Sequence, residues 1–199
     1  FNNVPKLTPH TIKLWAAILN EIPNSRLVLK APSFKDSSAI NVFTERFVAE
    51  GVEASRLEFR GPVGLTEMMA EYADIDIALD PVPYNGGTTT LQAMWMGVPV
   101  IVKTGNHFVS RMGASFMTAA GLKKWVAEND ADYLRIAVEM AQDRKALLSL
   151  KQDLRKRLLS SPAWNIDHFT TDFSDALLKM WHEYSCLLYT SPSPRDAHE

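Results

Sequence analysis

Two glycines followed by three threonines, Gly86 to Thr90, are the residues of this chain best suited to hold a phosphate group. They follow a run of turn-forming residues, Pro81 to Asn85, and they begin a segment with helical character that Gly97 and Pro99 end. The threonines therefore stand at the start of a predicted helix, where unpaired backbone N–H groups and the positive end of the helix dipole favour an anion. The glycines allow the backbone to approach a phosphate without an intervening Cβ atom.

Three segments follow predicted strands, and in an open parallel sheet such segments meet at the edge where ligands bind. The first holds Asn3 and Lys6, the second runs from Gly61 to Leu65, and the third runs from Asn85 to Gln92. Lys6 supplies a compact positive charge, and residues 87–90 supply backbone donors and hydroxyl groups, a combination that suits a diphosphate. The sequence has no His, Cys or Asp cluster with the spacing of metal ligands, so this arrangement is predicted to need no metal.

Each of these residues also has a structural interpretation. Lys6 could be a solvated surface lysine, Asn85 could be a turn residue, and one threonine could cap the helix, which is compatible with phosphate binding. Asp80, at the end of the preceding strand, is predicted to fix the loop rather than to act as an acid or base. The scattered histidines are predicted to be surface or structural residues: His10, His107, His168 and His182.

Strands and helices alternate along the chain up to residue 126, and an all-helical region follows Asn129. Strands are predicted at 26–30, 57–59, 76–79, 98–102 and 125–126. Helices are predicted at 8–21, 36–50, 65–72, 88–96, 110–120, 130–142, 144–159 and 167–184. Strands separated by helices favour parallel pairing through right-handed crossovers. The predicted fold is α/β, a Rossmann-like parallel sheet with C-terminal helices, and its first strand is expected to end at Phe1 and to be mostly missing.

Composition narrows the class of protein further. The chain has 199 residues, 46% of them hydrophobic, and a net charge of −2, which suits one domain with its own core. The nearly neutral charge predicts no nucleic-acid partner, and no apolar run approaches the ~20 residues that span a bilayer, so no membrane partner is predicted. The single cysteine, Cys186, excludes an internal disulfide. Because the sequence begins with Phe1 rather than Met, it is expected to be a fragment of a longer protein.

The last residues differ abruptly from the rest. A predicted amphipathic helix ends at Tyr184, and a Ser/Pro-rich run without periodicity follows. Residues 186–196 resemble the translated read-through of a transposon sequencing adapter, so 186–199 are predicted to be a non-native tail and residues 1–185 the domain.

Residues Tyr84 to Val100 resemble the nucleotide-sugar signature of the O-linked N-acetylglucosamine transferase family, which includes SPINDLY-type proteins. Further segments match in the same order: 1–6, which resembles the family's phosphate-contacting lysine segment, then 108–115, then 161–165 with the helix that follows it. The resemblance covers residues 1 to about 185.

This resemblance implies the C-terminal lobe of a GT-B glycosyltransferase. The implied activity is inverting transfer of N-acetylglucosamine from UDP-GlcNAc to Ser/Thr hydroxyls of proteins, in the cytoplasm and without a cofactor. The residues that it implies for binding the nucleotide-sugar donor are Asn3, Lys6, Val63, Met68, Gly87, Thr88, Thr89 and Gln92. The family's proposed catalytic histidine, the acceptor groove for the protein partner and the tetratricopeptide repeats lie upstream, so no catalytic residue is expected here and the chain alone is predicted to be inactive.

The sequence departs from the family pattern at two positions. Gln92 stands where the family has an acidic residue that binds the ribose hydroxyls, and Met68 stands where it often has a histidine that packs on uracil. Glutamine lacks a charge-assisted acceptor, and methionine packs on a base without a hydrogen bond. These departures leave other readings open: O-fucosyl transfer from a GDP-sugar, N-glucosyl transfer to asparagine, or a non-catalytic nucleotide-sugar sensor or scaffold. A sugar-nucleotide epimerase fits the signature less well.

Overall fold

The computed structural model describes residues 1–190, apart from the side chains of Ala163 and 188–190. The chain divides into two compact units, Phe1–Ser161 and Pro162–Glu199, which are treated separately. The predicted tail beyond residue 190 lies outside the described residues.

The strands of the first unit are all parallel, as the sequence predicts. They are β1 (Leu27–Lys30), β2 (Leu57–Arg60), β3 (Ala78–Leu79), β4 (Val100–Lys103) and β5 (Val126–Ala127). Among the described residues β1 pairs with β2, and a separate ladder runs in the order β3-β4-β5. The parallel α/β prediction is confirmed, but the strands form two hydrogen-bonded groups rather than one continuous sheet.

The helices of the first unit lie close to their predicted positions. They are α1 (Pro9–Glu21), α2 (Ser37–Ala49), α3 (Leu65–Ala70), α4 (Thr88–Trp95), α5 (Met112–Ala119), α6 (Asp130–Gln142) and α7 (Arg144–Leu159). Short 3-10 helices connect them: η1 (Val4–Lys6), η2 (Pro32–Lys35), η3 (Ala54–Arg56), η4 (Glu71–Asp74), η5 (Phe108–Ser110) and η6 (Lys123–Trp125). Side-chain caps explain the accuracy at four helix starts, because each cap oxygen accepts a backbone N–H of the first turn: Thr8, Asp36, Asn129 and Asp143.

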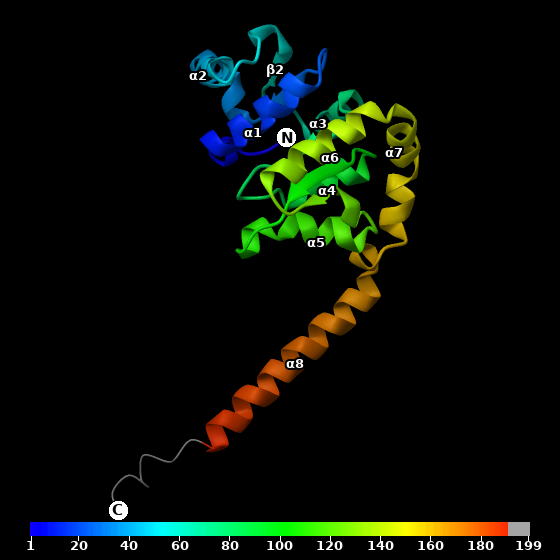
Figure 1. The fold of residues 1–199 in the computed structure, drawn as a ribbon. Helices are drawn as coiled ribbons and strands as arrows, with labels where there is room; N and C mark the ends of the chain where they lie inside the picture. The colour runs from blue at the N-terminus through cyan, green and yellow to red at the C-terminus, as the bar shows by residue number, and fades with distance from the viewer. Residues whose placement is uncertain (191–199) are drawn as a thin grey trace, which may run out of the picture. The chain divides into compact units, whose positions relative to one another are not determined.

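The core of the first unit surrounds β4. Val100, Ile101 and Val102 are almost completely buried, because β4 has a strand on each side and contacts α5 and α6. Figure 1 shows α4, α5 and α6 around this green strand. On α2, Val48 is 48% exposed, whereas Phe47 beside it is fully buried.

The second unit is η7 (Pro162–Trp164) followed by the long helix α8 (Ile166–Thr190), drawn in orange to red in Figure 1. The sequence predicts a helix end at Tyr184, but α8 continues for six more residues. Trp181 is 62% exposed, and Phe169 and Phe173 stack on each other at 5.9 Å between ring centroids. None of the described helices is long and apolar enough to cross a membrane.

Candidate functional site

The loop between β3 and α4, residues 80–87, is held in place by the carboxylate of Asp80. Its Oδ1 accepts hydrogen bonds from the backbone N–H of Gly86 (3.0 Å) and the hydroxyl of Thr90 (3.1 Å). The Asp80 carbonyl accepts a bond of 2.9 Å from the Tyr133 hydroxyl on α6. Asp80 therefore closes the loop onto the first turn of α4, which is the role that the sequence predicts for it.

Asp80 is 2% exposed, and burial raises the pKa of its carboxyl group to about 6. The hydrogen bonds from Gly86 and Thr90 and the positive charges of Lys6 and the terminal amine oppose this rise. Within the described part of the chain, its second oxygen, Oδ2, has no hydrogen-bond partner. This buried carboxyl group is thus held by neutral donors on one oxygen, and burial disfavours its ionised form.

Gly86 is required by packing. A Cβ atom at this position would lie 2.3 Å from the Thr90 hydroxyl oxygen and 2.7 Å from Asp80 Oδ1. A methyl group would therefore displace the two bonds that close the loop. Gly87 is less crowded, because its nearest neighbour would be the terminal methyl carbon of Met112 at 3.1 Å.

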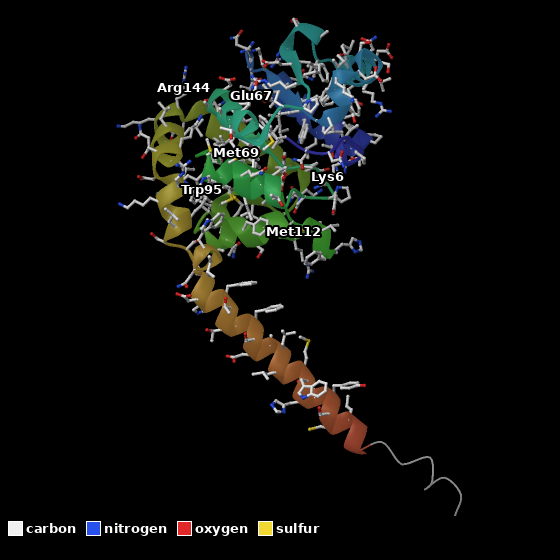
Figure 2. The ribbon with its side chains drawn as sticks, turned by 180° about the vertical axis from the view of Figure 1, so that it is seen from behind. Lys6, Glu67, Met69, Trp95, Met112 and Arg144 are labelled. Carbon is white, nitrogen blue, oxygen red and sulfur yellow. The ribbon has the colours of Figure 1, made fainter. Side chains whose placement is uncertain are left out.

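Lys6 lies beside this loop, although 79 positions separate it from its partner in the sequence. Its ammonium group donates a hydrogen bond of 2.8 Å to the carbonyl of Asn85 and lies 4.1 Å from the centre of the Tyr84 ring. Partial burial lowers the pKa of Lys6, and the charge of Asp80 partly opposes that shift. The structure thus brings Lys6 to the loop that precedes the threonines. Figure 2 labels Lys6 and Met112.

The first turn of α4 retains backbone donors. The N–H groups of Thr90 and Leu91 both donate to the Gly87 carbonyl, and the Thr90 hydroxyl is bound to Asp80. The first N–H groups of an α-helix have no intrahelical acceptor, and in α4 these belong to Thr88 and Thr89. Fewer hydrogen-bond donors are therefore free at residues 87–90 than the sequence predicts, because the Thr90 hydroxyl is already bonded to Asp80 in the loop. We call Lys6, loop 80–87 and the first turn of α4 the cradle.

The two asparagines that the sequence places near the cradle have different roles. Asn85 is 1% exposed, and its amide nitrogen donates to the Pro81 carbonyl (3.2 Å) and the Lys103 carbonyl (3.4 Å), so it is a buried turn residue. Asn3 is exposed and accepts the backbone N–H of Lys6 through its carbonyl. Its neighbour Asn2 makes the side-chain contact with the cradle, since its amide oxygen accepts a 3.4 Å bond from the Thr89 hydroxyl.

Tyr72 connects the cradle to α3 and was missed by sequence reasoning. Its hydroxyl donates to the Thr89 carbonyl at 3.4 Å, and its ring stacks on Phe1 at 4.2 Å between centroids. Tyr72 follows Met68 by four residues, so it ties the segment that holds Met68 to the start of α4. In the sequence, Tyr72 stands at the end of an apolar helical segment, and nothing in that pattern indicates a contact with Thr89.

The remaining predicted donor residues lie on the elements expected. Val63 is 39% exposed in the loop after β2, Met68 is half-buried on α3, and Gln92 is half-buried on α4 one turn after Thr88. Their roles toward a base or a ribose stay predictions.

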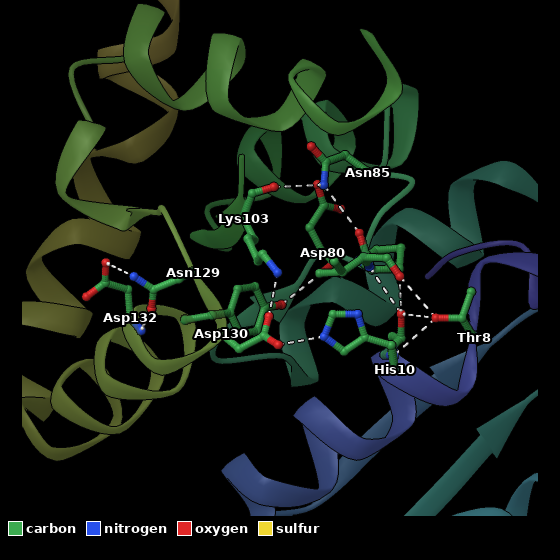
Figure 3. A network of polar contacts seen from close by, with 12 residues as sticks. Thr8, His10, Asp80, Asn85, Lys103, Asn129, Asp130 and Asp132 are labelled. Carbon is green, nitrogen blue, oxygen red and sulfur yellow. Dashed lines mark hydrogen bonds and ion pairs between the residues drawn. The ribbon is translucent and has the colours of Figure 1, made fainter. Parts of the chain in front are cut away.

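A second polar network lies at the same strand ends, as Figure 3 shows. Lys103, the last residue of β4, binds Asp130 Oδ1 at 2.5 Å, and His10 Nε2 lies 2.7 Å from Asp130 Oδ2. Burial would raise the pKa of Asp130, but the bonds from Lys103 and His10 outweigh it and lower that pKa. The network joins the starts of α1 and α6 to the end of β4, so His10 is structural.

The described residues contain no group of three or more His, Cys, Asp or Glu side chains that could hold a metal ion. Apart from the buried Asp80 carboxylate that closes the loop, the cradle offers one ammonium group, backbone N–H groups and threonine hydroxyls. These groups suit an anionic ligand with several oxygen acceptors.

Comparisons with known proteins place the chain among related sequences and folds. The family model described as glycosyl transferase family 41 matches residues 1–173. A Hordeum vulgare protein named "Probable UDP-N-acetylglucosamine--peptide N-acetylglucosaminyltransferase SPINDLY" is 36% identical over 185 residues, and its Arabidopsis thaliana namesake is 35% identical. In Caenorhabditis elegans, a UDP-N-acetylglucosamine--peptide N-acetylglucosaminyltransferase is 27% identical over 184 residues.

The fold has a solved counterpart as well. A mutant of the Thermobaculum terrenum O-GlcNAc transferase is similar with a TM-score of 0.86 and 36% identity, over 92% of this chain and 35% of that chain. Each SPINDLY match covers 92% of this chain but 20% of the relative. These similarities confirm the predicted GT-B lobe and its family, and this chain belongs to glycosyl transferase family 41.

Proposed function

We propose that this chain forms the donor-binding part of a protein O-glycosyltransferase, which transfers N-acetylglucosamine from UDP-GlcNAc to Ser/Thr hydroxyls of proteins. The observation that carries the proposal is the cradle, where Lys6 and the free N–H groups of α4 converge from segments far apart in the sequence. The names of the relatives support the same donor and a peptide acceptor. A cytoplasmic location stays a prediction.

The chemistry assigned to the cradle is stabilisation of a leaving diphosphate. As the bond between the sugar and UDP breaks, negative charge grows on the diphosphate oxygens. The ammonium group of Lys6 and the N–H groups of Thr88 and Thr89 would stabilise that charge with little reorganisation. No residue of the chain is assigned the role of general base.

Isothermal titration of the chain with UDP, uridine and GDP tests the proposal. Binding of UDP that is tighter than binding of uridine, and that is unchanged by EDTA, would support a metal-independent cradle. A strict need for a divalent metal, or equal affinities for UDP and uridine, would overturn it. Tighter binding of GDP than of UDP would favour the GDP-sugar alternative.

A second candidate, a nucleotide-sugar sensor without catalysis, is favoured by Gln92. A neutral amide accepts ribose hydroxyls less strongly than a carboxylate does. The substitution Gln92→Glu separates the two functions in a transferase assay on a protein that contains this chain with an N-terminal lobe. A large gain in turnover on substitution, from a near-zero wild-type rate, would support the sensor, and an already active wild type would exclude it.

A further inference from the structure

The segment that carries Lys6 and the loop that carries Asn85 are joined at a second point, in the interior of the first unit. Thr11, in the first turn of α1, is completely buried. Its hydroxyl donates a hydrogen bond of 2.7 Å to the Val82 carbonyl, and the same oxygen accepts a bond of 3.1 Å from the Val82 backbone N–H. One side chain therefore binds both backbone groups of a residue in loop 80–87.

Two further contacts place this hydroxyl beside the Lys6 segment. The Lys6 carbonyl oxygen lies 3.3 Å from Thr11 Oγ1, and the Thr8 hydroxyl oxygen lies 3.1 Å from it. Since a hydroxyl has a single proton and the Val82 carbonyl is the nearer acceptor, that carbonyl receives the Thr11 proton. The Thr8 hydroxyl reaches the same carbonyl at 3.1 Å, and Figure 3 shows the bonds of Thr8 at the start of α1.

The bonds of Thr11 and the bond of Lys6 connect the same two segments, but they differ in exposure. The Lys6 side chain is only partly buried, and its ammonium group is the one that would leave the Asn85 carbonyl for a phosphate oxygen. The Thr11 hydroxyl is shielded from any ligand in the cradle, because its residue is completely buried. The bonds of Thr11 therefore persist when Lys6 exchanges its partner.

Loop 80–87 has other bonds that maintain its shape. The Asp80 carboxylate closes it onto α4, and the Asn85 side-chain amide binds two carbonyl groups. Loss of the Thr11 hydroxyl would therefore release the Lys6 segment, whereas the loop and the first turn of α4 would keep their positions. This difference separates the role of Thr11 from that of the residues that build the loop.

We propose that Thr11 is a positioning residue of the cradle. Its buried hydroxyl holds the Lys6 segment against loop 80–87, so the ammonium group stays within reach of a diphosphate after it leaves the Asn85 carbonyl. The inference rests on the proposed function, because Thr11 is completely buried and acts on the ligand only through Lys6.

Calorimetric titration of Thr11 variants with UDP and uridine tests this role. Thr11→Val keeps the branched shape but removes the hydroxyl, so UDP affinity should fall roughly 3- to 10-fold, the effect of one neutral hydrogen bond. Uridine affinity should not change, because uridine has no phosphate for Lys6 to bind. Thr11→Ser keeps the hydroxyl and should bind UDP as wild type does. Thr44→Val is the matched control, since it removes a hydroxyl that donates to the Ile40 carbonyl on α2.

The double variant Lys6→Ala/Thr11→Val separates a positioning role from a purely structural one. If Thr11 acts through Lys6, then Thr11→Val should change the UDP affinity of the Lys6→Ala chain by less than about twofold. An equal loss in both backgrounds would show that Thr11 supports the cradle as a whole, and would overturn the proposal. A loss of uridine affinity in Thr11→Val would overturn it as well.

Hydrogen exchange on the wild-type chain tests the same bonds without a substitution, should Thr11→Val not fold. The Val82 amide, which donates to Thr11 Oγ1, should exchange no faster in saturating UDP than in the free chain. Faster exchange on UDP binding would show that the connection opens, and would contradict the proposal.

Failure of this inference is distinguishable from failure of the proposed function. If wild type binds UDP no more tightly than uridine, the proposed function is wrong and the role of Thr11 is wrong with it. If Lys6→Ala weakens UDP binding whereas Thr11→Val does not, the inference about Thr11 alone is overturned.

Discussion

The ammonium group of Lys6 is held by a neutral carbonyl and an aromatic face rather than by a carboxylate bond. A lysine held in this way can exchange its carbonyl partner for a phosphate oxygen without breaking an ion pair. Asn85, whose carbonyl accepts the bond from Lys6, is itself held by its buried side-chain amide, which donates to the Pro81 carbonyl.

Replacing Lys6 should therefore weaken the binding of UDP. A hydrogen bond to a charged group contributes about 1.5–3 kcal/mol, so Lys6→Ala should lower UDP affinity roughly 10- to 100-fold in a calorimetric titration. Lys13→Ala, on the exposed face of α1, is the matched control and should bind as wild type does. Equal affinity of the Lys6 variant and wild type would remove Lys6 from the site.

The Thr89 hydroxyl should contribute less than Lys6 does. Thr89→Val keeps the shape and the backbone N–H but removes one neutral hydrogen bond, a loss of about 1–1.5 kcal/mol, so affinity should fall ~10-fold or less. The same calorimetric titration with UDP measures this loss of affinity. A loss greater than that of Lys6→Ala would mean that the hydroxyl, and not the lysine, dominates recognition.

Gly86 should tolerate no side chain. The added methyl group of Gly86→Ala would displace the Thr90 and Asp80 oxygens, which predicts a loss of about 1–3 kcal/mol in the free energy of unfolding. Gly61→Ala is the matched control, because its Cβ would meet Lys35 at an ordinary distance of 3.6 Å. Urea denaturation of both variants checks the prediction, and equal stabilities would contradict it.

At the scale of elements, the loop that joins β3 to α4 is held by the buried carboxyl group of Asp80. The pKa of this group differs between the folded and the unfolded chain. Burial raises the pKa of Asp80 from 3.8 to about 6, so the folded chain holds this proton more tightly than the unfolded chain does. The stability that this proton contributes is present below about pH 4 and is lost as the pH rises through 6.

Asp80→Asn should remove this pH dependence, since an amide does not ionise. Between about pH 4 and about pH 6, the free energy of unfolding should fall by up to about 3 kcal/mol more in wild type than in the variant, since each pKa unit corresponds to about 1.36 kcal/mol. Urea denaturation across this range measures the difference. The Phe1 amine has a pKa that is lowered from 8.0 to about 6. Its ionisation therefore changes the stability mainly above about pH 6, where the stability rises with pH instead of falling. Parallel curves for the two proteins would contradict the assignment.

At the scale of the whole molecule, the long helix α8 contains the start of the segment that resembles adapter sequence. Deleting residues 186–199 should shift the melting temperature by less than about 2 °C, because a tail that is foreign to the protein would not contribute to its folded core. Differential scanning calorimetry of the full and shortened chains measures this. A drop of several degrees would show that this segment contributes to the folded structure.

The sequence by itself determined the local elements and the candidate chemistry. Helix starts follow from cap residues such as Thr8 and Asp36, and the strands follow from short apolar runs, because both signals act over a few neighbouring residues. The glycine-threonine turn and Lys6 were recognisable for the same reason: their residue types already define an anion-binding group. The alternation of strands and helices predicted the fold class, and the resemblance of several segments to a known family predicted the family; both predictions are confirmed.

Only the tertiary structure decided which of these groups meet. The bond from Lys6 to Asn85, the loop closed by Asp80 and the contact of Tyr72 with Thr89 join residues 10 to 79 positions apart. The exposure of Val48 and the separation of β1 from β3 likewise depend on which surfaces pack together. Local propensity cannot fix such contacts, since their free energy arises from burial and hydrogen bonding between segments that the chain brings together only when it folds.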